Sequence, residues 1–271
     1  IIILCASLMA GSISCHHGER ATEPENPGNV DDNKETGDEK PDGEAGAGND
    51  VVILFTNDLH SQIEPIGKDD TYNPDKGGVA RIKVLVDSVR AAEKAVIVAD
   101  AGDFVQGTYY FTCLGGDVEM MVQKEIGYDV RTIGNHEFDN GANELAAHLR
   151  HVKAAKLSAN YDVSGTALDG VLQPYVIKHV GGKRIAFMGI NLNPKGMIAD
   201  KSFVGIRYID AETVALQLSD YLKQTGIADY VVMVSHIGHV GSPGTLNDVE
   251  IVRKSHNIDL VIGGHSHTLV D

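Results

Sequence analysis

The stretch VVILFTNDLH (residues 51–60) decides the fold. It opens with five consecutive apolar residues, most of them β-branched, which is typical of a strand buried on both faces of a sheet. Asp58 and His60 follow directly after this run. In open α/β sheets, sites assemble at the carboxyl ends of strands, so Asp58 and His60 stand where such a site would form.

Strand and helix patterns alternate along the rest of residues 51–271. The pattern predicts strands at residues 95–99, 129–133, 157–159, 230–235 and 259–263, and helices at residues 79–94, 117–126, 141–154, 211–224 and 246–255. Residues 174–180 and 183–190, which Gly181 and Gly182 separate, predict a β-hairpin. The alternation indicates an α/β layered fold, and the hairpin means that the sheet is not purely parallel.

Residues 1–15 predict an export signal. They contain an apolar run that is too short to span a bilayer comfortably as a permanent helix. The small residues Ser12 and Ser14 precede Cys15, which resembles the lipobox of bacterial lipoproteins, although Ser12 stands where that motif prefers Leu. We therefore expect an exported lipoprotein at the periplasmic face or the cell surface, attached to the membrane through a lipid on Cys15. Ordinary signal cleavage near Ser14 is the alternative.

Residues 16–50 predict a disordered acidic tether. They contain 11 acidic and three basic residues, about half of the formal net charge of −15. A segment with so few apolar residues cannot compensate for the entropy lost on ordering. The negative charge of the whole chain argues against nucleic acid as a partner, because a phosphate backbone requires a basic surface. With Cys5 in the signal and Cys15 lipidated, Cys113 has no partner for a disulfide.

Polar residues follow five of the predicted strands in the domain at residues 51–271. They are Asp58, His60, Asp103, Asn135, His236, His265 and His267. Because strand ends gather at one edge of an α/β sheet, we expect these side chains to converge. Imidazole, carboxylate and carboxamide groups suit divalent ions such as Zn, Mn or Co. Seven ligands are too many for one tetrahedral ion, and they suit two ions that share a carboxylate, an arrangement used for phosphate-ester hydrolysis.

These blocks resemble a known superfamily. Asp58-x-His60, Gly102-Asp103, Gly134-Asn135-His136-Glu137, His236 and Gly264-His265-x-His267 are similar to the five-block signature of the calcineurin-like metallophosphoesterases. The stretches YDVRTIGNHEFD (128–139), GDFVQG (102–107) and KGGVARI (76–82) resemble the branch that contains 5′-nucleotidases and UDP-sugar hydrolases. The resemblance covers residues 51–271 and implies a four-layer α/β/β/α sandwich.

The resemblance also implies roles for single residues. One metal would be held by Asp58, His60, Asp103 and His267, and the second by Asp103, Asn135, His236 and His265. His267 stands where some nucleotidases have Gln, which bears on metal preference. His136 would contact the phosphoryl group, and Asp139 would orient its imidazole. We expect Glu137 to make structural hydrogen bonds, and His239 to lie at a pocket rim or in solvent.

The implied reaction is 5′-nucleotidase-type hydrolysis of exported nucleotides by a hydroxide that two metals activate. A 2′,3′-cyclic nucleotide phosphodiesterase and a UDP-sugar hydrolase are the alternatives within the superfamily. A non-catalytic, lipid-tethered binding module is the alternative of another class. In the 5′-nucleotidase branch a C-terminal domain binds the base and the substrate phosphate. We therefore expect residues 51–271 to be a catalytic domain truncated at its C-terminus, which a further domain or a partner chain completes.

Overall fold

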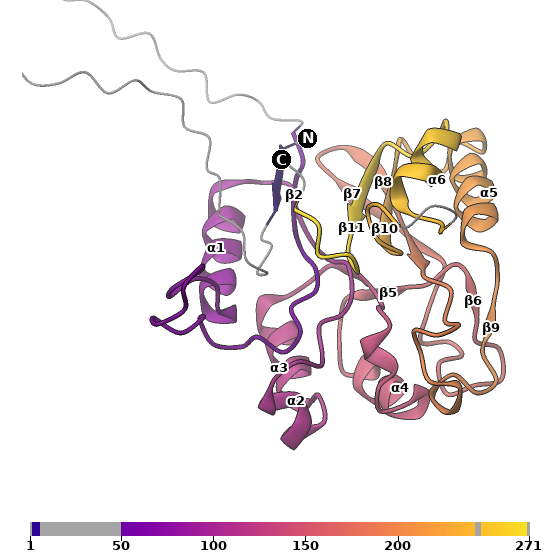
Figure 1. Cartoon of the computed structure of the whole chain (residues 1–271). Helices are drawn as coiled ribbons and strands as arrows, with labels where there is room; N and C mark the ends of the chain where they lie inside the picture. The colour runs from indigo at the N-terminus through magenta and orange to yellow at the C-terminus, as the bar shows by residue number, and fades with distance from the viewer. Residues whose placement is uncertain (1, 6–49, 242–244, 270–271) are drawn as a thin grey trace, which may run out of the picture.

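Two β-sheets pack against each other at the centre of the protein (Figure 1). The computed structural model describes the backbone of residues 2–5 and all of residues 50–241 and 245–269. The first sheet has the order β1-β2-β3-β4-β5 and is parallel throughout. Its strands are β1 (Ile2–Cys5), β2 (Val52–Thr56), β3 (Val96–Asp100), β4 (Val130–Thr132) and β5 (Ala155–Leu157).

The second sheet has the order β11-β10-β8-β7. Its strands are β7 (Tyr175–Val180), β8 (Lys183–Asn191), β10 (Tyr230–His236) and β11 (Leu260–Gly263). β7 and β8 form the expected antiparallel hairpin, whereas β8, β10 and β11 run parallel to one another. A two-stranded ribbon of β6 (Tyr161–Asp162) and β9 (Arg207–Tyr208) lies outside both sheets.

Helices cover the outer face of each sheet. α1 (Val79–Ala92) and α3 (Asp117–Ile126) pack on the first sheet, and α5 (Ala211–Gln224) and α6 (Asp248–Lys254) pack on the second. The remaining helices are α2 (Tyr109–Leu114), α4 (Ala142–Arg150) and the short 3₁₀ turns η1 (His136–Phe138) and η2 (Asp200–Ser202). The layers are therefore α/β/β/α, which confirms the predicted fold class.

The strand β2 shows why the opening stretch is apolar at every position. Ile53 points into the core between the two sheets, where it joins residues such as Phe187 of β8. Val52 and Leu54 point the opposite way, into the core beneath α1 and α3. Successive side chains of a strand alternate between its faces, so a strand buried on both sides needs an uninterrupted apolar run.

The structure differs from the sequence prediction mainly at helix ends and in short elements. The predicted helix at residues 141–154 ends at Arg150, because the chain must turn before it enters β5 at Ala155. The predictions omitted α2, which has only six residues between the capping side chain of Thr108 and the left-handed Gly115. They also omitted β6 and β9, which have two residues each and show no period.

The segment predicted as an export signal contributes one strand. The backbone of Ile2–Cys5 forms β1 and pairs in parallel with β2, in the register Ile2 to Val52. A short apolar run has the same composition in a signal segment and in a buried strand, so composition alone does not separate the two. Cys15 and residues 16–49 lie outside the described residues, and the signal, the lipid and the tether stay predictions. Among the described residues, no helix is long and apolar enough to cross a membrane.

Candidate functional site

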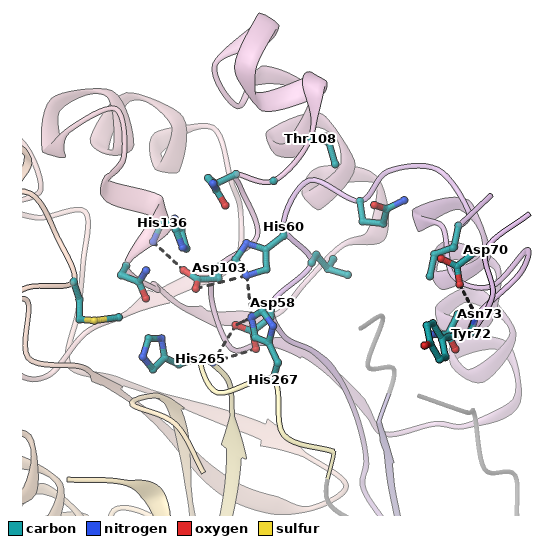
Figure 2. Close-up of a pocket in the computed structure, with 17 residues that line it drawn as sticks. Asp58, His60, Asp70, Tyr72, Asn73, Asp103, Thr108, His136, His265 and His267 are labelled. Carbon is teal, nitrogen blue, oxygen red and sulfur yellow. Dashed lines mark hydrogen bonds and ion pairs between the residues drawn. The ribbon is translucent and has the colours of Figure 1, made fainter. Parts of the chain in front are cut away.

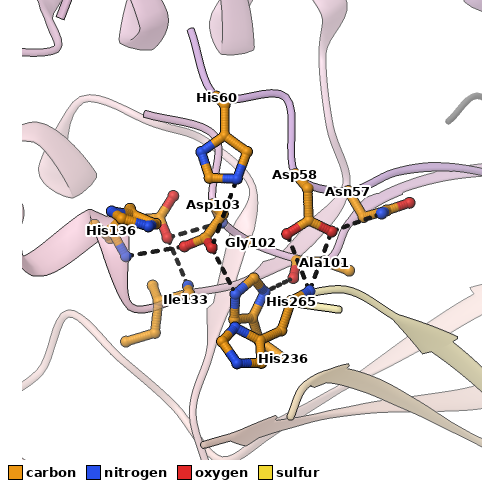
Figure 3. A network of polar contacts seen from close by, with 12 residues as sticks. Asn57, Asp58, His60, Ala101, Gly102, Asp103, Ile133, His136, His236 and His265 are labelled. Carbon is orange, nitrogen blue, oxygen red and sulfur yellow. Dashed lines mark hydrogen bonds and ion pairs between the residues drawn. The ribbon is translucent and has the colours of Figure 1, made fainter. Parts of the chain in front are cut away.

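The seven predicted ligands converge where the carboxyl ends of the two sheets meet (Figures 2 and 3). Asp58 and His60 follow β2, Asp103 follows β3, and Asn135 follows β4. From the second sheet, His236 ends β10, and His265 and His267 follow β11. Six of them line an open cleft of 760 Å³, and His236 lies fully buried beneath it.

The ligand atoms fall into compact sets. Within each of three groups they lie within 4.8 Å of one another: Asp58, His60 and His267; Asp103, His236 and His265; and His60, Asp103 and His136. Oδ2 of Asp103 is 2.9 Å from Nε2 of His236 and 3.9 Å from Nε2 of His60. Asp103 is therefore a member of the second group that also approaches His60 of the first group, as a shared ligand would have to.

Two observations indicate that these side chains are suited to binding metal ions. Nε2 of His60 lies 3.1 Å from Nε2 of His267, so two ring nitrogens converge on the same point (Figure 2). Oδ1 of Asn135 is buried and accepts no hydrogen bond from any described residue. Buried polar atoms are normally paired, so an unpaired carboxamide oxygen beside carboxylates and imidazoles indicates a missing electropositive partner. The donor set contains no thiolate and suits borderline or hard divalent ions.

The backbone at the site is unusual. Five of the seven candidate ligands have a left-handed conformation: Asp58 (φ 51°), His60 (φ 46°), Asp103 (φ 52°), His265 (φ 76°) and His267 (φ 51°). Non-glycine residues adopt this region rarely, although Asp, Asn and His do so more often than others. Each such residue costs on the order of 1–3 kcal/mol unless the surroundings enforce it, and such strain clusters at functional sites.

Hydrogen bonds between loops enforce these turns. The N–H of Asp58 donates to the carbonyl of Gly102 at 2.9 Å, and the N–H of His60 donates to the carbonyl of Asp103 at 3.0 Å. Asp58 in turn accepts from the N–H of His265, at 3.0 Å to Oδ1 and 3.1 Å to Oδ2. The loops that follow β2, β3 and β11 are thus joined directly, across the boundary between the sheets.

Two glycines permit the close approach of these loops to one another. A Cβ at Gly134 would collide with the carboxylate of Asp103. A Cβ at Gly264 would lie 2.9 Å from both the carbonyl oxygen of Ala101 and Nδ1 of His236. No side chain fits at either position without moving a candidate ligand.

His236 is oriented from behind by the main chain. Its Nδ1 lies 2.6 Å from the carbonyl oxygen of Ala101, and because a carbonyl only accepts, Nδ1 carries a proton (Figure 3). Nε2 consequently points at Asp103. A backbone partner of this kind fixes the orientation of metal-binding imidazoles.

His236 and Asp103 each shift the pKa of the other. Burial by itself lowers the pKa of His236. The negative charge of Asp103 and its contact with the imidazole together have the larger effect and raise the pKa above its usual value, to about 9. Burial likewise raises the pKa of Asp103, but the positive charge of His236 holds it well below its usual range. Burial lowers the pKa of His60 and of His265, so both imidazoles are neutral near pH 7 and able to donate to a metal.

His136 and Asp139 form a close pair beside these ligands. Nδ1 of His136 lies 3.0 Å from Oδ2 of Asp139, and both side chains are partly exposed. The backbone N–H of His136 donates to Oδ1 of Asp103 at 2.9 Å. Because His136 also belongs to the group with His60 and Asp103, its position is compatible with contact to either a metal or a substrate.

Several residues of the cleft were not found from the sequence. Gln62, Ile66, Asp70, Tyr72, Asn73, Thr108 and Met197 line it. The first five belong to the irregular segment between β2 and α1, whose sequence shows no helix or strand period from which its position could be predicted. Figure 2 labels Asp70, Tyr72, Asn73 and Thr108. Glu137 makes structural hydrogen bonds, as expected. His239 borders a neighbouring pocket rather than this cleft.

Fold and site together define a class of protein: a two-sheet α/β sandwich with a cluster of Asp, His and Asn side chains, suited to divalent metals, at the strand ends. The profile of the calcineurin-like phosphoesterase family matches residues 51–269. The chain belongs to this family.

The relatives include named nucleotidases. The chain is 32% identical to the 5′-nucleotidase of Bos taurus over 82% of this chain and 38% of that protein. It is 31% identical to the NAD 5′-nucleotidase of Haemophilus influenzae over 81% of this chain and 36% of that protein. Among solved structures, a 5′-nucleotidase precursor from Thermus thermophilus superposes with a TM-score of 0.72 at 31% identity, covering 81% of this chain and 42% of the other. The chain thus spans about two fifths of the length of these relatives.

Metal binding should be coupled to the loss of a proton from His236. With a pKa of about 9, His236 is protonated at pH 7 in the metal-free protein, and a metal must displace that proton. Affinity should therefore rise from pH 7 to pH 9, by about tenfold per unit for one proton. Titration calorimetry of chelator-treated protein with MnCl₂, in buffers of different ionisation enthalpy, measures both affinity and proton release. His256→Ala, at an exposed position, should keep this dependence, and an affinity that is constant over this pH range would contradict the prediction.

Proposed function

We propose that this chain is the catalytic domain of a metal-dependent phosphoesterase that hydrolyses nucleotides in the manner of a 5′-nucleotidase. The observation that supports the proposal best is the placement of Asp103. Its carboxylate belongs to the group with His236 and His265, also approaches His60 of the other group, and accepts a hydrogen bond from the backbone N–H of His136. The candidate ligands and His136 lie at or directly beneath one open cleft. Membership of the calcineurin-like phosphoesterase family supports the same reaction class.

The proposed centre holds two divalent ions, with Zn, Mn and Co as candidates. Asp58, His60, Asp103 and His267 would bind one ion, and Asp103, Asn135, His236 and His265 the other. When bound, such ions supply Lewis acidity, which polarises a phosphate ester and lowers the pKa of water.

The chain's own residues would supply orientation and charge. Because Nδ1 of His136 faces Asp139, Nε2 is the ring nitrogen available to the phosphoryl oxygens of a substrate. Asp139 would hold the imidazole in this orientation. The backbone contact from His136 to Asp103 would keep the imidazole at a constant distance from the centre.

The cleft suits a small phosphoester with an apolar part. Its volume of 760 Å³ lies within the range of about 300–1,000 Å³ typical of small-molecule sites. Leu59, Ile66, Tyr72 and Met197 contribute apolar surface to a lining that also contains carboxylates and imidazoles, and Tyr72 is 84% exposed. A nucleotide has this combination of phosphate and aromatic base. The relatives extend well beyond the matched region, so a further domain or a partner chain would supply the remaining contacts to the substrate.

A hydrolysis screen that separates the products by chromatography tests the substrate class, because cyclic nucleotides and UDP-sugars are cleaved to phosphomonoesters without release of inorganic phosphate. The complete protein, reconstituted with Mn²⁺, Zn²⁺ or Co²⁺, should release phosphate fastest from nucleoside 5′-monophosphates. Faster turnover of 2′,3′-cyclic nucleotides or UDP-sugars would replace the proposed substrate with the corresponding alternative. If the protein binds metal and nucleotide but hydrolyses none of these compounds, it is a binding module and the proposal is wrong.

Substitutions should separate the roles of His136 and Asp103. His136→Asn should leave the metals bound but slow turnover by roughly 10²–10⁴-fold, because it removes a group that acts on the phosphoryl oxygens. Asp103→Asn should lower metal content and activity together, because it weakens the ligand shared by both ions. Asp139→Asn should resemble a milder His136→Asn.

Metal stoichiometry measured beside phosphate release decides between these roles. His179→Asn, at an exposed position on β7, is the control and should match the wild type. If His136→Asn loses metal as completely as Asp103→Asn does, His136 is a ligand and its assigned role is wrong.

We further propose that the protein is exported and lipid-anchored through Cys15, with residues 16–50 as a tether. The apolar run before Cys15 and the acidic, apolar-poor segment after it support this proposal. Mass spectrometry of the membrane fraction should find a mature chain that begins at a lipidated Cys15 and therefore lacks Ile2–Cys5, the residues that form β1. A soluble product with an unmodified N-terminus at another residue would exclude the anchor and leave the phosphoesterase proposal intact.

A further inference from the structure

A buried ion pair lies behind the loops that present Asp103 and Asn135. Nη2 of Arg131, in β4, lies 3.0 Å from Oε1 of Glu137, in η1. The arginine is fully buried and the glutamate is 5% exposed, and among the described residues neither lines the cleft. Both therefore lie too deep to touch a substrate there, although they are within a few residues of Asn135 and His136 in the sequence.

The carboxylate of Glu137 joins two loops. Its Oε2 accepts hydrogen bonds from the N–H of Gly134 at 2.5 Å and the N–H of Asp103 at 3.0 Å. Its Oε1 accepts from the N–H of Phe104 at 2.9 Å and from Arg131. A carboxylate has about four acceptor positions, so these four donors saturate it. Such charge-assisted bonds are roughly twice as strong as neutral ones.

The hydrogen bonds to Glu137 hold a residue whose backbone conformation is unfavourable. Asp103 has a left-handed backbone, with φ 52°, and Glu137 holds both its N–H and that of the next residue. If these bonds were lost, two buried N–H groups would lack partners and the turn could relax. The side chain of Asp103 would then leave its present position, with Oδ1 on the N–H of His136 and Oδ2 at His236.

Arg131 compensates the buried negative charge. Its guanidinium also donates to Oε1 of Gln123 at 2.5 Å and to the carbonyl of Thr132 at 3.2 Å, and it lies 3.9 Å from Asp100. A buried carboxylate without a counter-charge is costly, so Glu137 needs this partner to remain among the backbone donors. Gln123 belongs to α3, so the pair connects the site to the helix layer behind the first sheet.

We propose that Glu137 and Arg131 are positioning residues that set the metal affinity of the site through the backbone of Asp103. They contact neither the cleft nor the candidate ligand atoms, and they act by holding the shared carboxylate within reach of both ligand groups. The proposal rests on the metal centre proposed above, but not on its substrate or on turnover.

Metal affinity of Glu137→Gln tests the proposal. The amide keeps the size of the side chain, but it loses the charge and turns an NH₂ group toward backbone N–H donors. Calorimetric titration of the chelator-treated full chain with MnCl₂ should show binding weaker by roughly 10–100-fold, the usual effect of removing a residue that orients a metal ligand. Thermal unfolding in excess chelator shows whether the metal-free fold is retained.

Glu119→Gln is the matched control. Glu119 in α3 is also a fully buried glutamate, but its carboxylate accepts no hydrogen bond from the described residues. This variant should bind Mn²⁺ with wild-type affinity. A loss of affinity in Glu119→Gln as large as in Glu137→Gln would mean that replacing any buried glutamate, rather than losing the bonds to Asp103, is responsible, and it would overturn the proposal.

Two further measurements complete the test. Wild-type affinity in Glu137→Gln overturns the proposal directly. If Glu137→Gln does not fold, Arg131→Lys is measured instead, since lysine keeps the charge but cannot bridge the same partners. The affinity of Arg131→Lys for Mn²⁺ should be several-fold weaker than that of the wild type. An unchanged affinity would overturn the proposal. A wild-type protein that binds Mn²⁺ but releases no phosphate would refute the proposed reaction and leave this inference standing, whereas a wild-type protein that binds no metal refutes both.

Discussion

The rest of the site depends on the carboxylate of Asp103. It is contacted from both sheets: the N–H of His136, after β4, reaches one oxygen, and His236, at the end of β10, reaches the other. These contacts tie together loops that belong to separate halves of the chain. The position of one side chain therefore requires that the two sheets meet at their carboxyl ends in a single relative arrangement.

The core between the sheets stabilises that arrangement. Residues such as Ile53, Ile97, Phe187 and Val234 are buried between the sheets and hold them face to face. This apolar contact can offset the unfavourable features at the strand ends, where left-handed residues and buried charges accumulate. Stability and site chemistry are thus separated in space, with apolar burial along the strands and strain at their ends.

Polar contacts behind the site then hold each loop in place. The carbonyl of Ala101 accepts from Nδ1 of His236, and Glu137 accepts from Asp103, Phe104 and Gly134. These contacts lie beneath the candidate ligands rather than in the cleft. They explain why the stretch GNHEFD needs more polar residues than a turn does: Asn135 and His136 line the cleft, Asp139 contacts the imidazole of His136, and Glu137 faces inward.

The sequence by itself determined the strands, most helices and the candidate ligands. An apolar run at residues 51–55 has to be buried on both faces, and polar residues after several such runs have to gather where strands end. Local patterns contain this information. Tertiary structure alone decided which strands share a sheet, how the segment around Tyr72 forms a wall of the cleft, and which donors Glu137 receives. These features depend on contacts between residues far apart in the chain, and no local period or propensity records such contacts.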